Sequence, residues 1–123
     1  MKIDFAQVLV DMDGETLQEP IPNKFEEDGK TPILRDVTLG RLCSRALLQP
    51  GEDEKIQGDE HLRRFLLAEK VHVKKIVEIE KVESVVLIKE CLAQAFPLNP
   101  IVVGQSFKMI EGMNGVADAA NPE

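Results

Sequence analysis

The chain has 123 residues, which is enough for one domain with a modest hydrophobic core. Its net charge of −7 argues against direct binding to nucleic acid, because phosphate neutralisation needs a basic surface. The apolar runs are too short to span a bilayer, and acidic residues at positions 4 and 11 interrupt any hydrophobic leader. This composition suits a cytoplasmic protein whose partner carries basic or apolar patches.

The first part of the chain is expected to be rich in β-structure. Apolar and polar residues alternate loosely over residues 3–19, and Asp13-Gly14 is a strong hairpin signal, because a type I′ turn needs positive φ at both central positions. Residues 20–31 hold two prolines, a glycine and an acidic run, which predicts an exposed loop. The stretch "PILRDV", residues 32–37, is a candidate short strand.

The next segment has the pattern of a helix that packs on a core. Thr38 is a favourable N-cap, and the helix is expected to run to about residue 49, before Pro50-Gly51. Gly40 weakens this helix by about 1 kcal/mol relative to alanine. The apolar residues follow the i, i+3, i+4, i+7 and i+8 spacing of a buried face: Leu39, Leu42, Cys43, Ala46 and Leu47.

Three further helices are predicted. The second covers residues 59–75, with acids at its start and lysines near its end, as the helix dipole favours. Residues 76–82 read as a short strand or an extended linker, and the third helix covers residues 82–96. Asn99 caps the fourth helix, which ends near Gly112. One side of the second helix is expected to carry Leu62, Phe65, Leu66, Glu69 and Val73.

These elements predict an α+β fold that is mainly α, a small bundle of about four short helices with an N-terminal β-hairpin. We expect a single globular domain over residues 1–111, made of the hairpin, 3–19, and a helical part, 37–111. Residues 112–123 are small and polar, which predicts a flexible C-terminal tail. Helices of this length are marginal alone, so they must pack together or against a partner.

The stretch "VLVDMDGETL" is the one motif that raises a question of chemistry. An apolar run followed by D-x-D-G resembles the opening motif of haloacid-dehalogenase-like phosphatases, which would make Asp11 a nucleophile and Asp13 an acid/base with Mg²⁺ between them. Glu15 stands where that family has threonine, and the chain is too short for the family's doubly wound sheet. A turn explains the same residues, and we favour it.

No other group of residues predicts an enzyme, a metal site or a cofactor. His61 and His72 are eleven residues apart on one predicted helix, or about 16 Å by helical rise, so they cannot share a metal. Neither has a serine or cysteine nearby in the sequence. Cys43 and Cys91 lack metal-ligand spacing and are expected to be buried thiols in a reducing compartment. The sequence therefore predicts a binding protein without a cofactor.

One family resemblance extends over residues 37–111. The stretches "VTLGRLCSRALL", "HLRRFLLAEKV", "VVLIKECLAQAF" and "PIVVGQSFKMIEG" resemble, in this order, a group of small proteins encoded by tailed bacteriophages and prophages. The acidic charge, short amphipathic helices and β-prone start are also similar to tail-assembly chaperones. The resemblance implies a phage protein in the cytoplasm of a bacterial host, and it implies no catalytic residue.

We therefore expect a non-enzymatic phage accessory protein that acts by protein–protein binding in virion tail assembly. Two alternatives stay open: a structural component of the virion, and an acidic inhibitor of a host nucleic-acid enzyme. The partner would be a phage structural protein or a host protein, and homo-oligomerisation is compatible with the short helices. The candidate partner-binding residues are apolar and lie on the second and fourth predicted helices: Phe65, Val103, Phe107 and Ile110.

Overall fold

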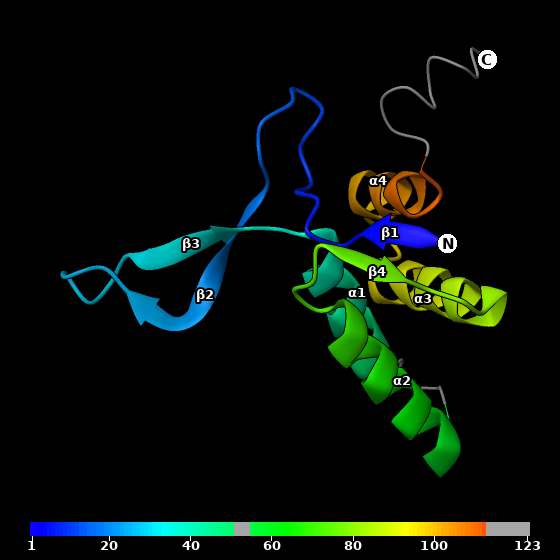
Figure 1. Ribbon diagram of the computed structural model, residues 1–123. Coiled ribbons are helices and arrows are strands. Elements are labelled where there is room, and N and C mark those ends of the chain that lie inside the picture. Colours follow the sequence, from blue (N-terminus) through cyan, green and yellow to red (C-terminus); the bar gives the residue numbers. More distant parts are fainter. Residues whose placement is uncertain (51–54, 113–123) are drawn as a thin grey trace.

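The computed structural model describes residues 1–50 and 55–112, and over these residues the fold is α+β, as predicted (Figure 1). Most of the predicted tail, residues 113–123, lies outside the described residues. In chain order, the elements are β1 (Lys2–Asp4), β2 (Gln18–Phe25), β3 (Pro32–Asp36), α1 (Leu39–Leu48), α2 (Gly58–Val71), β4 (Ile76–Glu78), α3 (Val82–Ala95) and α4 (Pro100–Ile110).

The described strands form two separate antiparallel pairs, β1 with β4 and β2 with β3. The sequence placed β1 in a hairpin over residues 3–19, but β1 pairs instead with β4, so that Ile3 lies opposite Val77 and both are buried. The longer hairpin is β2–β3, which includes most of the predicted loop over residues 20–31. Prolines are tolerated there because each strand of a two-stranded sheet is an edge strand.

The predicted turn in the D-x-D-G stretch is present. An isolated antiparallel bridge joins Val10 to Thr16, and the Asp11 carboxylate accepts hydrogen bonds from the N–H groups of Asp13 (2.8 Å) and Glu15 (2.9 Å). Gly14 has a φ of +83°, whereas Asp13 is not left-handed, so this is a three-residue loop ending in a glycine bulge and not the expected type I′ turn. Asp11 is held as part of the turn.

Helix α1 is the centre of the core. All five residues of its predicted stripe are at most 3% exposed, and the Thr38 hydroxyl accepts the Arg41 N–H at 3.4 Å, as expected for the N-cap. The helix packs against both α2 and α3. Cys43 and Cys91 are buried and form no disulfide, and burial, followed by the proximity of Cys91, raises the pKa of Cys43.

Gly40 lies where α1 meets the end of α2. A Cβ at this position would overlap the Val71 carbonyl oxygen and would lie 2.5 Å from that of His72. The Gly40 N–H donates to the Phe5 carbonyl at 2.8 Å, which brings the N-terminal segment to the same point. Glycine is therefore required here for close backbone approach, at the expense of helix propensity.

Helix α2 does not bury the side that carries its largest apolar residues. Its buried residues are Arg64, Leu67, Ala68 and Val71. The residues expected along one side of this segment are all exposed, and four of them are large and apolar: Leu62 (59% exposed), Phe65 (51%), Leu66 (53%) and Val73 (61%). The helix consequently has apolar residues on two opposite sides.

Helices α3 and α4 complete the core beside the β1–β4 pair (Figure 1). Asn99 caps α4 by accepting the Val102 N–H at 3.2 Å, Pro100 is the first helical residue, and Gly112 follows the helix with a φ of +70°, all as expected. The Gln105 side chain donates to the Val10 carbonyl and accepts the Val10 N–H, each at 2.8 Å. This pair of hydrogen bonds ties α4 to the N-terminal loop.

Candidate protein-binding surfaces

The β2–β3 hairpin projects from the body of the molecule, and we call residues 18–36 the arm (Figure 1). A two-stranded hairpin is marginally stable in water by itself, so contacts at its base and tip must hold it. At the base, Glu19 accepts hydrogen bonds from Arg35 (2.9 Å) and from Arg45 of α1 (3.0 and 2.9 Å). The two arginines thereby join both strands of the arm to the helical core.

Partial burial of Glu19 alone would raise its pKa, but the hydrogen bonds from Arg45 and Arg35 outweigh this effect and hold the pKa below its ordinary value. The carboxylate is only 16% exposed, so this ion pair is better shielded from water than most surface pairs. The ionised form of Glu19 is therefore part of what fixes the arm to α1.

Replacing Glu19 with glutamine is expected to reduce the free energy of unfolding by about 1–2 kcal/mol at pH 7. Because the folded-state pKa is lowered, this stabilisation is complete above the ordinary value of 4.5 and is lost as the pH falls through the folded-state pKa. Urea unfolding of the wild type and E19Q at several pH values measures it. Glu27→Gln, at the exposed arm tip, is the matched control, and an equal loss in both variants would contradict the role of Glu19.

The tip of the arm is also fixed by hydrogen bonds. One Asp28 oxygen accepts the N–H groups of Lys30 (2.8 Å) and Thr31 (2.9 Å), and the other accepts the Thr31 hydroxyl (2.6 Å). These bonds, with the Thr31 hydroxyl first, lower the pKa of Asp28. Gly29 adopts a φ of +71°, which closes the turn. The arm is thus preorganised at both ends.

One face of the arm is apolar and faces away from the Glu19 ion pairs. The strand register sets Pro20 opposite Leu34 and Phe25 opposite Pro32, and side chains paired in this way share a face. Leu34 is 50% exposed and Phe25 51%, while the alternate residues Ile33 and Arg35 are half-buried. We call this set the arm face: Pro20, Phe25, Pro32 and Leu34.

A second exposed apolar surface lies on α2, on the side opposite the core. We call it the α2 outer face: Leu62, Phe65 and Leu66 on the helix, and Val73 two residues after its end. Each of the four residues is more than half exposed, and the first three follow the i, i+3, i+4 spacing of one helical side. Exposed apolar residues are ordinary singly, but a contiguous group of large ones marks an interaction surface.

A groove of about 320 Å³ runs beside the α2 outer face, between α1 and α2. At its floor the Ser44 hydroxyl lies 2.6 Å from His72 Nδ1 and 3.1 Å from the Arg41 carbonyl oxygen. The hydroxyl is within hydrogen-bond distance of both groups. Sequence analysis found no serine near either histidine, because the two residues are 28 positions apart and meet only through the crossing of α1 and α2. Ser44 is 3% exposed, which leaves no access for a substrate, so the pair fastens the two helices.

His72 makes the stability of this crossing dependent on pH. Partial burial of the ring lowers the pKa of His72 below 6.5, and Arg41, Arg35 and Arg45 act in the same direction. A lowered pKa means that the unfolded chain binds the proton more tightly, so stability is complete above pH 6.5 and decreases as the pH falls towards the folded-state pKa. We expect urea unfolding between pH 7.5 and 5.5 to show this decrease in the wild type and in His61→Gln, and a smaller one in His72→Gln. Equal slopes for all three proteins would contradict it.

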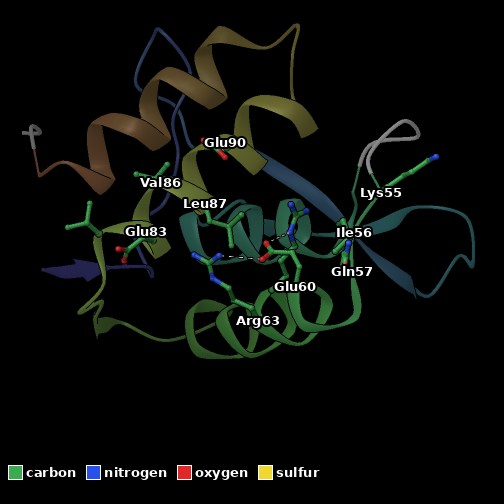
Figure 2. Close-up of a pocket in the computed structure, with 11 residues that line it drawn as sticks. Lys55, Ile56, Gln57, Glu60, Arg63, Glu83, Val86, Leu87 and Glu90 are labelled. Atoms are coloured by element: carbon green, nitrogen blue, oxygen red, sulfur yellow. Dashed lines mark hydrogen bonds and ion pairs between the residues drawn. The ribbon is translucent and has the colours of Figure 1, made fainter.

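A groove of about 580 Å³ lies between α2 and α3 (Figure 2). Glu60 is at its centre and accepts from Arg63 (3.3 Å) and Arg64 (3.1 Å) within the same helix. Glu83 and Glu90 of α3 line the other wall. Figure 2 shows Glu60 between the two walls, with its carboxylate directed to Arg63. Apolar side chains, Ile56, Val82, Val86 and Leu87, line the groove together with these charged groups, so it is a junction of mixed polarity between the two helices.

The predicted partner-binding residues have different surroundings. Phe65 belongs to the α2 outer face. Phe107 is half-buried against the core, with Lys89 Nζ 5.4 Å from its ring centroid, and Val103 is also half-buried. Ile110 is 1% exposed, so its assignment to a partner surface has to be corrected: it is a core residue of α4. The arm face was missed altogether, because its residues fell in a predicted loop and strand.

No group of three or more His, Cys, Asp or Glu side chains within residues 1–50 and 55–112 is arranged to hold a metal ion. In the same residues, no helix combines the length and the apolar character needed to cross a membrane. Comparison of the chain with protein-family models, curated proteins and solved structures gave no match.

Proposed function

We propose that this chain is a non-enzymatic accessory protein of a tailed bacteriophage, and that it binds another protein during assembly of the virion tail. The observation that supports binding is the arm face, which presents apolar side chains on a projecting arm fixed at both ends. Preorganisation of this kind reduces the entropy lost on binding. The phage setting comes from the sequence resemblance over residues 37–111.

The apolar and acidic side chains of the arm indicate which kind of partner would fit it. Next to Phe25, the tip carries three consecutive acids, Glu26, Glu27 and Asp28, in a chain with a net charge of −7. A partner with complementary charge would present an apolar segment flanked by basic residues. A tape-measure protein, whose long apolar helices need a cover before the tail forms, is the phage structural protein that we propose.

Co-expression with the tape-measure protein encoded by the same phage tests this function. We expect a soluble complex with the wild-type chain and its loss in the double variant F25S/L34S. Met12→Ser is the matched control, because Met12 is 86% exposed and lies outside the arm, so this variant should keep the complex. Failure of the wild type to form a complex, or its persistence in F25S/L34S, would contradict the proposal.

Purified virions distinguish assembly from a structural role. An assembly factor is released before the particle is complete, so mass spectrometry of purified virions should not find the chain in stoichiometric amount. Its presence at the copy number of a tail protein would replace the proposal with the structural alternative. Capture of a host polymerase or nuclease by the tagged chain, with no virion protein, would support the inhibitor alternative instead.

A further inference from the structure

Helix α2 has an apolar surface on each of two opposite sides, and only one of them is covered within the described residues. The core side holds Leu67, Ala68 and Val71, and the other side is the α2 outer face. A helix normally buries an apolar stripe against another element. In Figure 1, α2 extends beyond the other helices at one end of the molecule.

We propose that the α2 outer face is covered by the same face of a second copy of this chain, with the two α2 helices antiparallel about a two-fold axis. A two-fold interface requires a surface that is complementary to itself. The arm takes no part in it, since Figure 1 shows the arm and α2 extending from the body in different directions. The inference is therefore independent of the proposed binding by the arm.

The charges beside the α2 outer face have this self-complementary pattern. The exposed acid Asp59 precedes the apolar residues and the exposed base Lys70 follows them, on the same flank of the helix. If the axis passes between Arg64 and Phe65, at the middle of the helix, Asp59 of each copy lies opposite Lys70 of the other. The same axis sets the two Phe65 rings next to each other.

The remaining positions agree with this register. Glu69 interrupts the apolar residues. In this register, the position opposite Glu69 is next to His61 of the second copy. Helix α2 has 14 residues, or about 21 Å at 1.5 Å per residue, and this axis overlaps the two helices along their whole length. Each acidic N-terminal turn then lies beside the basic C-terminal end of the other helix, an arrangement that the helix dipoles favour.

Sedimentation equilibrium over micromolar to millimolar concentrations tests the proposal. We expect a reversible dimer for the wild type. Asp59→Lys turns both attractive pairs of the dimer into repulsive ones, and Lys70→Asp does the same. For each variant we therefore expect the dissociation constant of the dimer to rise roughly tenfold or more. The double variant D59K/K70D restores both pairs and should dimerise like the wild type.

Glu27→Lys makes the same charge change as Asp59→Lys but lies at the arm tip, so its dissociation constant should not change. Circular dichroism checks that each variant keeps the helical content of the wild type, which is expected because both exchanged side chains are exposed. A wild type that stays monomeric at all concentrations would overturn the proposal. A dimer that neither single variant weakens, or that the double variant does not restore, would also overturn it.

Discussion

Replacing Gly40 with alanine is expected to destabilise the protein by about 3 kcal/mol. Helix propensity alone predicts the opposite, a gain of about 1 kcal/mol. The difference arises because a Cβ at Gly40 would overlap the Val71 carbonyl and press on that of His72, and carbonyls within a packed helix end cannot rotate away as a side chain can. Relieving the overlap requires α1 and α2 to separate, which also lengthens the contact between Ser44 and His72.

Urea unfolding of G40A measures this effect, and Gly104→Ala is its matched control. Gly104 also lies inside a helix, α4, but its Cβ would meet nothing within 4 Å. Propensity alone acts there, so G104A should gain up to about 1 kcal/mol. If G40A were as stable as G104A, this result would contradict the close approach of α1 to the end of α2 at Gly40.

The second large effect is expected from Phe5→Ala, at about 3–5 kcal/mol. Phe5 is fully buried, its N–H donates to the Lys75 carbonyl at 2.6 Å, and its carbonyl accepts from Gly40. The ring therefore fills the core at the point where the N-terminal segment joins β4 and α1. Since small domains have only about 5–15 kcal/mol of stability, this variant should be close to unfolding.

Thermal and urea unfolding measure the loss in F5A. Phe25→Ala is the matched control, because the same atoms are removed from a ring that is 51% exposed, and the cost should be within about 1 kcal/mol. Similar losses in the two variants would show that the N-terminal segment does not contribute to the core as described.

The sequence predicted α1 in detail because its apolar residues form a single stripe. Helix α2 has two stripes, and periodicity cannot say which of them packs inward. The larger side chains, Leu62, Phe65 and Leu66, lie on the side that does not pack inward. The structure buries the side with the smaller Ala68 because α1 and α2 approach closely at Gly40, a tertiary constraint that has no local signal.

The β-structure was harder to predict, for a different reason. Pairing of β1 with β4 joins residues more than 70 positions apart, which no local pattern reveals. In the arm, Pro20 and Pro22 indicated a loop, although edge strands accept proline. The turn at Asp11 was predictable because the Asp-Gly signal is local, and only its exact type differed. The exposed apolar groups follow the same rule: helical spacing places Phe65 beside Leu62 and Leu66, whereas the arm face is recognised only from the strand register.

Both proposals require that other polypeptides cover apolar surfaces of this chain, and for α2 the proposed cover is a second α2. An equimolar mixture of D59K and K70D tests it most directly. In the mixed dimer the lysine introduced in one copy faces the aspartate introduced in the other, and the unchanged Asp59 faces the unchanged Lys70. We predict that the separate variants sediment mainly as monomers and that the mixture sediments as a dimer. A mixture that stays as monomeric as its two components would contradict the claim.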